Sequence, residues 1–188
     1  MSISRARQRA QSVKLMAFDV DGVLTDGMLY FSSRGDELKA FNILDGHGMK
    51  MLAHAGIVLA IITGRRSRAV ELRARNLGIE LLLQGIEDKR AAMHALLEQR
   101  ALGFADAGYM GDDVVDLPLL RACGFSASVP SGHALVQSHV DYLTRAAAGR
   151  GAVREVCELI LVAQGKLDTA LAPYLASCSE SPPACPPK

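Results

Sequence analysis

The sequence predicts an α/β fold in which helices cover both faces of a parallel sheet. Short apolar runs of strand length alternate along the chain with amphipathic segments of helical length, which is the pattern of strands joined by helical crossovers. The first run, residues 13–18, is apolar almost throughout, as expected for a strand buried on both faces. Right-handed crossovers would bring the carboxyl ends of all these strands to one edge of the sheet.

The later elements follow from the same periodicities. Further strands are predicted at residues 57–62, 80–83, 107–110, 125–129 and 140–143. Helices are predicted at residues 49–55, 67–77, 88–99, 114–122 and 152–164. Gly78 is placed as the stop of its helix, since glycine readily takes the left-handed conformation there.

A β-hairpin is predicted between the first strand and the first helix. Residues 28–32 and 37–41 are β-prone and flank a short turn that contains Gly35. An isolated hairpin is marginally stable in water, so its apolar side chains need a surface to pack on. The residues alone leave open whether that surface is the core of the same chain or another subunit.

Length and composition bound the protein class. The chain has 188 residues, enough for one domain with a substantial core. Its net charge of +1 and aromatic content of 5% do not suggest nucleic-acid binding. No segment reads as a membrane span or a secretory signal. None of the four cysteines forms a CxxC pair, so neither structural zinc nor a disulfide framework is predicted, and a reducing cytoplasm fits.

Three segments are expected along the chain. Residues 1–12 are polar and basic and are predicted to be a flexible N-terminal arm. Residues 13–165 carry the α/β domain with its hairpin insertion at about 28–41. Residues 166–188 form a C-terminal tail, whose Pro- and Ser-rich end is predicted to be disordered.

Polar residues follow the predicted strands at the carboxyl edge of the sheet. Asp19 and Asp21 come directly after the first strand, and carboxylates at i and i+2 of an extended chain project to the same side. They repel each other unless a cation lies between them, and an ion that prefers oxygen, such as Mg²⁺, fits. Thr63 and Gly64 precede a helix, whose first N–H groups suit a phosphate.

Two further loops add a cation and more acid. Lys89 starts a helix, an unfavourable place for a cation unless an anion is bound nearby. Asp112, Asp113 and Asp116 follow the strand at 107–110. Each feature alone can be a helix cap, a solvated lysine or a loop carboxylate. Together, at equivalent strand ends, they predict a metal cradle beside a phosphate site.

These motifs match a known superfamily in order. Residues 19–25, Thr63, Lys89 and residues 111–116 resemble the first to fourth motifs of the haloacid dehalogenase superfamily. The resemblance implies a Rossmann-like sheet and Mg²⁺-dependent phosphoryl transfer. It also implies no large cap domain, because the stretch between the first two motifs holds only a hairpin and a helix.

The resemblance implies a role for each matched residue. Asp19 would be the nucleophile that forms an aspartyl-phosphate, and Asp21 the general acid and then the general base. The Asp19 carboxylate, the Asp21 carbonyl and Asp112 would hold Mg²⁺. Thr63 and Lys89 would hold phosphate oxygens. It also implies that Asp113 and Asp116 support these residues without touching the substrate, and that Asp116 orients Lys89.

Longer stretches are similar to one family of phosphatases. Residues 19–27, 41–48, 62–65 and 149–157 resemble the 3-deoxy-D-manno-octulosonate 8-phosphate phosphatases, which serve lipopolysaccharide precursor synthesis. The resemblance implies a cytoplasmic hydrolase that releases the free sugar acid and phosphate. It also implies a homotetramer in which the 28–41 hairpins form a central barrel and a neighbouring subunit helps to cap each site.

The substrate contacts implied by this resemblance are less specific. Arg65 and Arg73 match arginines that bear on the substrate, although Arg73 can equally be an exposed helix charge. Gly64 is expected to lie beside the phosphate, and Asp45 and Gly46 near the sugar hydroxyls. His47 stands where a Tyr is expected in these phosphatases, and no catalytic role is predicted for it.

Three alternatives stay open beside this substrate. The same motifs occur in phosphatases for nine-carbon keto-sugar acid phosphates, which would differ only at the rim of the site. A broad sugar-phosphate phosphatase would share the whole mechanism. A non-catalytic scaffold is disfavoured because it predicts loss of catalytic residues, and Asp19, Asp21, Lys89 and Asp112 are all present.

Overall fold

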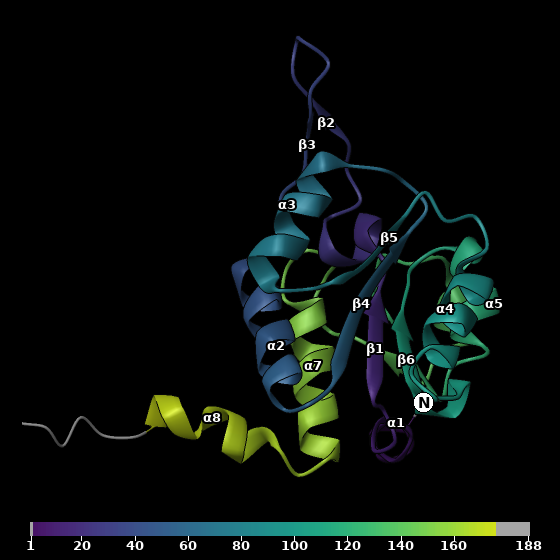
Figure 1. The fold of residues 1–188 in the computed structure, drawn as a ribbon, viewed down its shortest axis with the longest axis vertical. Coiled ribbons are helices and arrows are strands. Elements are labelled where there is room, and N and C mark those ends of the chain that lie inside the picture. The colour runs from purple at the N-terminus through teal and green to yellow at the C-terminus, as the bar shows by residue number, and fades with distance from the viewer. Residues whose placement is uncertain (1, 176–188) are drawn as a thin grey trace, which may run out of the picture.

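The computed structural model describes residues 2–175 and contains a six-stranded parallel sheet (Figure 1). The strand order is β5-β4-β1-β6-β7-β8, and every neighbouring pair is parallel. The strands are β1 (Leu15–Phe18), β4 (Val58–Thr63), β5 (Leu81–Gln84), β6 (Ala107–Met110), β7 (Phe125–Ser128) and β8 (Tyr142–Leu143). The predicted parallel α/β sheet is confirmed, and β1 lies at its centre.

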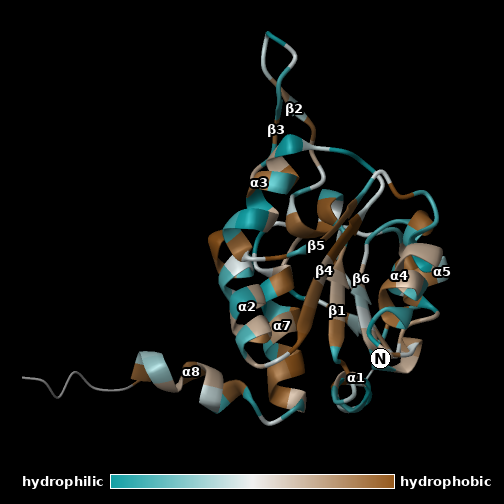
Figure 2. Cartoon of the chain, in the orientation of Figure 1, coloured by the Kyte–Doolittle hydropathy of each residue, from teal (hydrophilic) through white to brown (hydrophobic). Residues whose placement is uncertain are grey.

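Helices cover both faces of the sheet, as predicted. One face packs against α2 (Ile43–His54), α3 (Arg68–Leu77) and α7 (Ala152–Ala163). The other packs against α4 (Lys89–Glu98), α5 (Leu117–Leu120) and α6 (Ala134–Gln137). Along β1, Met16 and Phe18 belong to the first core and Leu15 and Ala17 to the second. This double burial is why the central strand is apolar throughout (Figure 2).

The segments outside this layered body differ in part from the sequence prediction. Residues 1–12 were expected to form a flexible arm, but α1 (Ile3–Ala10) is a helix that packs against α7. Ala6 and Ala10 are fully buried because two small residues four apart let the helix approach closely. The predicted tail begins with α8 (Leu167–Leu175), while residues 176–188, with Cys178 and Cys185, lie outside the described residues.

Two helices have different bounds from those predicted. Helix α2 begins at Ile43 rather than at 49, because the Asn42 side chain accepts hydrogen bonds from the Leu44 and Asp45 N–H groups. Two glycines in its first turns hide this start from a propensity argument. The predicted helix at 114–122 is instead a 3₁₀ turn, Val114–Asp116, followed by the short α5.

The predicted hairpin is present and projects from the body of the protein (Figure 1). Strands β2 (Tyr30–Phe31) and β3 (Glu37–Leu38) pair antiparallel in a separate two-stranded sheet. Its large apolar side chains are exposed: Met28, Leu29, Tyr30, Phe31 and Leu38. The hairpin therefore does not fold onto the core of its own chain.

Helices α2 and α7 are held together by a buried carboxylate. The Asp45 side chain is 1% exposed and accepts hydrogen bonds from the Arg154 N–H (2.8 Å) and the Gly151 N–H (3.2 Å) at the start of α7. Burial raises the pKa of Asp45, and these hydrogen bonds oppose that rise. The carboxylate thus supplies the acceptor that the free N–H groups of α7 need.

Replacing Asp45 with Ala should lower the free energy of unfolding by about 1 to 3 kcal/mol, because it leaves buried N–H groups of α7 without an acceptor. Urea unfolding followed by circular dichroism measures this change. The exchange Asp168→Ala, on α8, is the matched control and should have a much smaller effect. Equal stability of the Asp45 variant and the wild type would contradict this role.

Candidate active site

A cleft of about 510 Å³ opens at the carboxyl ends of β1 and β4, and all four predicted loops reach it. Its lining consists of Asp19, Asp21, Thr63, Gly64, Arg65, Ile86, Glu87, Lys89, Asp112, Asp113 and Val115. The topology therefore brings together the strand-end residues that the sequence analysis singled out. None of the helices in the described range 2–175 is long and apolar enough to cross a membrane.

The turn after β1 positions the first two carboxylates. Asp19 accepts a hydrogen bond from the Val20 N–H at 2.7 Å, and the chain then winds through residues 20–24. Gly22 has φ +84°, and a Cβ at this position would lie 2.1 Å from Asp112 Oδ2. Glycine is therefore required twice, for the left-handed backbone and for the close approach to Asp112.

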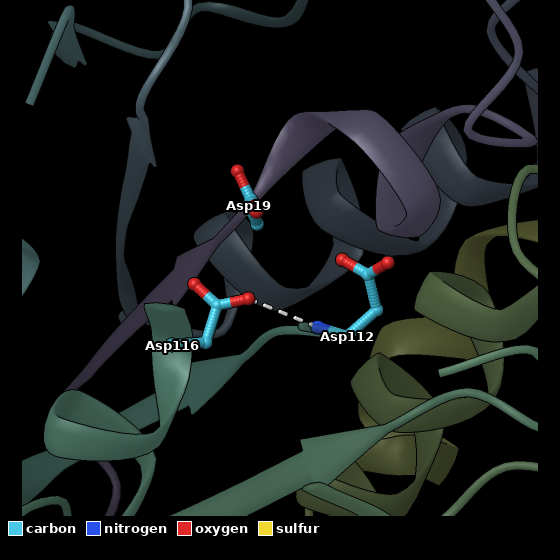
Figure 3. Close-up of side chains that lie close together, drawn as sticks. All are labelled: Asp19, Asp112 and Asp116. Carbon is cyan, nitrogen blue, oxygen red and sulfur yellow. Dashed lines mark hydrogen bonds between the residues drawn. The ribbon is translucent and has the colours of Figure 1, made fainter. Parts of the chain in front are cut away.

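Three carboxylates converge in the cleft (Figure 3). Asp19, Asp112 and Asp116 each offer an oxygen, and these oxygens lie within 4.8 Å of one another. Burial, followed by the charge of Asp116, raises the pKa of Asp19 to about 6. Burial and the charge of Asp19 raise the pKa of Asp112 to about 7. Such a cluster favours a divalent cation, which relieves the repulsion between its members.

The hydrogen bonds of the cluster separate candidate metal ligands from supporting groups. Each oxygen of Asp116 accepts two hydrogen bonds. Oδ1 accepts from Lys89 and Tyr109, and Oδ2 accepts from the N–H groups of Asp112 and Asp113. By contrast, Asp112 Oδ1 is buried and receives no hydrogen bond from any residue in 2–175. A hard cation such as Mg²⁺ fits these donors, and Asp112 has the oxygen to offer it.

Lys89 lies between two of the carboxylates. Its buried ammonium is 2.8 Å from Asp19 Oδ2 and 2.6 Å from Asp116 Oδ1. Burial lowers the pKa of Lys89, but the charges of Asp19 and Asp116 outweigh it, so the pKa stands above its ordinary value. Lys89 is therefore a permanent positive charge beside Asp19. The hydroxyl of Tyr109, which sequence reasoning missed, contacts both Lys89 and Asp116.

A second missed group comes from the base of the hairpin. The Lys39 ammonium bonds Asp21 Oδ1 and lies 3.3 Å from Glu37. Arg65, which follows Thr63 and Gly64, is 3.0 Å from Glu37 and 3.7 Å from Asp21 Oδ2. The alternation of a strand places Glu37 and Lys39 on one side, which was the available hint in the sequence.

Three predicted substrate contacts are not part of this cleft. The Asp45 oxygens accept hydrogen bonds from N–H groups of α7, and its predicted contact with the sugar stays a prediction. Arg73 donates a hydrogen bond to the Asn42 carbonyl at 3.0 Å and lies against Gly46. Gly46 and Arg73 thus belong to the packing of α2 on α3. His47 contacts Tyr174 edge to face, away from the catalytic carboxylates.

Comparison with known proteins identifies the family. The chain is 48% identical over 162 residues to the 3-deoxy-D-manno-octulosonate 8-phosphate phosphatase of Escherichia coli K12, covering 86% of each protein. The chain belongs to the 3-deoxy-D-manno-octulosonate 8-phosphate phosphatase family. A scan against models of protein families finds no match.

Solved structures of this phosphatase family have the same fold as this chain over more than nine tenths of its length. A probable YrbI family phosphatase from Pseudomonas syringae has a TM-score of 0.91 and 49% identity, covering 93% of this chain and 99% of its own. The phosphatase from Moraxella catarrhalis, solved with magnesium, phosphate and KDO, has a TM-score of 0.90 and 44% identity, covering 92% and 99%. The haloacid dehalogenase fold implied by the motifs is thereby confirmed.

Replacing Asp112 with Asn should raise stability in the absence of Mg²⁺ and should weaken the stabilisation that Mg²⁺ gives. The raised pKa means that the folded wild type binds the Asp112 proton more tightly than the unfolded chain, where the pKa is near 3.8. In EDTA, the wild type should therefore lose stability relative to the variant as the pH rises from about 4 to 7. With Mg²⁺ at a hundred times its Kd, binding should stabilise the wild type by about 2.7 kcal/mol.

Thermal unfolding at pH 5 and pH 8, in EDTA and in Mg²⁺, measures both effects. The variant should melt above the wild type in EDTA at pH 8, and Mg²⁺ should raise the melting temperature of the wild type more than that of the variant. Asp168→Asn is the matched control and should respond to Mg²⁺ as the wild type does. An equal Mg²⁺ response in the Asp112 variant would contradict its assignment as a metal ligand.

Proposed function

We propose that the protein is a Mg²⁺-dependent phosphatase that hydrolyses 3-deoxy-D-manno-octulosonate 8-phosphate to the free sugar acid and phosphate. The observation that carries this proposal is Asp19, a buried carboxylate in the cleft with Lys89 at 2.8 Å and Asp112 opposite. The family relationship supports the same activity, since relatives at 48% identity carry this name. Lipopolysaccharide precursor synthesis is the corresponding process.

Asp19 acts as the nucleophile in this mechanism. One of its oxygens attacks the phosphorus, the bond from phosphorus to the sugar oxygen breaks, and an aspartyl-phosphate forms. Asp21 gives its proton to the departing sugar oxygen. In the second step Asp21 takes a proton from the water that attacks the phosphorus, and the bond to Asp19 breaks. Phosphate leaves, and both carboxyl groups return to their starting states.

Positive charge makes this attack possible. Lys89 keeps Asp19 ionised and draws the phosphate oxygens toward it. Asp19, the Asp21 carbonyl and Asp112 would hold Mg²⁺. The ion would supply positive charge that offsets the repulsion between the Asp19 carboxylate and the phosphate. Thr63 is the last residue of β4 and precedes Gly64, where a hydroxyl and backbone N–H groups can hold phosphate oxygens. Asp116 supports these groups by accepting hydrogen bonds from Lys89 and from the Asp113 N–H, and Asp113 belongs to the same loop as Asp112.

The substrate also carries a carboxylate, and Arg65 is the cation that suits it. The side chain of Arg65 lies on the rim of the cleft and is about half exposed. Its planar guanidinium can bind a carboxylate or phosphate through two hydrogen bonds. A nine-carbon keto-sugar acid phosphate would present the same groups, and a broad sugar-phosphate phosphatase would use the same Asp19 chemistry.

We further propose that the protein is a cytoplasmic homotetramer joined through the 28–41 hairpin, with a neighbouring subunit covering part of each cleft. The hairpin supports this because its apolar side chains are exposed in the single chain. Ile43 and Leu44, just beyond it, are 82% and 60% exposed and extend the apolar surface. The buried thiols Cys123 and Cys157 are unpaired, as expected in a reducing compartment.

Phosphate release with Mg²⁺ tests the substrate directly. Turnover of 3-deoxy-D-manno-octulosonate 8-phosphate should exceed that of ordinary sugar phosphates and of a nine-carbon keto-sugar acid phosphate, and EDTA should abolish it. Asp19→Asn should eliminate turnover while circular dichroism shows an intact fold. Equal turnover of all esters would reduce the activity to a general phosphatase. Substantial hydrolysis by the Asp19 variant would remove it as the nucleophile.

The interface proposal has its own test. Replacing Leu29 and Phe31 together with Glu puts two charges on the exposed apolar surface, so the protein should become monomeric and lose activity. Light scattering coupled to size exclusion measures the mass. The double exchange of Leu72 and Leu135, which are exposed outside the hairpin, to Glu is the control and should stay tetrameric. An active tetramer in the Leu29 and Phe31 variant would exclude this surface as the interface.

A further inference from the structure

We infer that Lys39 is a positioning residue for the general acid: its bond to Asp21 Oδ1 fixes the orientation of the carboxyl group that exchanges the proton with the substrate oxygen. The inference rests on the proposed function, because it assigns a partner to Asp21 in that mechanism. No motif marks Lys39 in the sequence. Its placement follows from the hairpin, which brings it back to the turn after β1.

The contacts of Lys39 are those of a fixed group rather than a surface lysine. Its side chain is only 1% exposed, and its ammonium bonds Asp21 Oδ1 and lies 3.3 Å from Glu37 Oε1. A buried ammonium needs such paired carboxylates, because leaving it unpaired is costly. The pairing in turn limits the conformations that the Asp21 carboxylate can take.

The two oxygens of Asp21 have different surroundings. Oδ1 is held by Lys39, whereas Oδ2 is buried and receives no hydrogen bond from any residue in 2–175. Arg65 lies 3.7 Å from Oδ2, too far for a hydrogen bond. Lys39 therefore anchors one oxygen of a carboxyl group that lines the cleft and leaves the other without a bond.

Glu37 completes a balanced group of four charges. Its Oε1 is 3.3 Å from Lys39 and 3.0 Å from Arg65, so two carboxylates and two cations alternate from Asp21 to Arg65. This group links the acid to Arg65, the proposed anion partner, through residues of the hairpin.

The hairpin thus combines two kinds of surroundings. Phe31 and Leu38 are exposed, whereas Glu37 and Lys39, on either side of Leu38, contact groups of the cleft. The acid is consequently oriented by the same segment that we propose as the subunit interface. Assembly and proton transfer then depend on one structural element.

Leaving-group dependence separates positioning of the acid from general damage. A sugar alkoxide needs a proton to depart, whereas p-nitrophenolate departs without one. In single turnovers with Mg²⁺, Lys39→Met should slow sugar release by about 100-fold, the scale of general acid catalysis. Release of p-nitrophenol from p-nitrophenyl phosphate should fall far less. Lys14→Met, an exposed lysine paired with Asp106, is the matched control and should change neither rate.

A double-mutant cycle checks that Lys39 acts through Asp21. In an Asp21→Asn background, Lys39→Met should cause no further loss of sugar release, because the group that it orients is gone. Lys39→Gln, which keeps a hydrogen-bond donor, serves as the second variant if Lys39→Met does not fold. It should retain more sugar release than Asp21→Asn.

The outcomes are distinct. Equal slowing of both esters by Lys39→Met and Lys39→Gln, or additive losses in the double-mutant cycle, would overturn the role of Lys39 while leaving the proposed function intact. A wild type that releases neither alcohol would overturn the proposed function and the role of Lys39 together. Selective loss of sugar release, absent in the Asp21→Asn background, would establish it.

Discussion

The repulsion among carboxylates at the carboxyl end of β1 is the constraint on which this structure depends. Asp19, Asp112 and Asp116 place oxygens within 4.8 Å of one another, and within residues 2–175 only Lys89 contributes a cation within contact of two of them. One ammonium does not balance three carboxylates, and burial together with their repulsion raises the pKa values of Asp19 and Asp112. The folded chain therefore leaves a strong preference for an added divalent cation.

Asp116 shows how the fold keeps this repulsion under control. It is fully buried, and both of its oxygens accept two hydrogen bonds. Gly111 makes room for it, since a Cβ there would lie 2.5 Å from the Asp116 carboxyl carbon. Because both Asp116 oxygens are occupied, Asp116 fixes Lys89 and the loop that carries Asp112, and Asp112 is the carboxylate with an oxygen that receives no hydrogen bond from residues 2–175.

The sequence was informative where structure follows from local pattern and from sheet topology. Apolar runs located the strands, and strand ends located Asp19, Thr63, Lys89 and Asp112 because parallel strands share one carboxyl edge. The sequence was less informative where a side chain finds its partner far along the chain. Asp45 accepts hydrogen bonds from N–H groups more than a hundred residues away, and no local pattern indicates these partners.

The hairpin is the clearest case of a local prediction with a non-local meaning. Its two strands were foreseeable from β-prone residues, but their surroundings were not. The structure shows that the apolar side chains face outward while Glu37 and Lys39 reach the cleft. A two-stranded sheet is marginally stable alone. Ion pairs of Glu37 and Lys39 with Asp21 and Arg65 stabilise the hairpin, while its exposed apolar side chains still need a surface to pack on. This insertion is the segment that connects the cleft to the exposed apolar surface that we propose as the subunit interface.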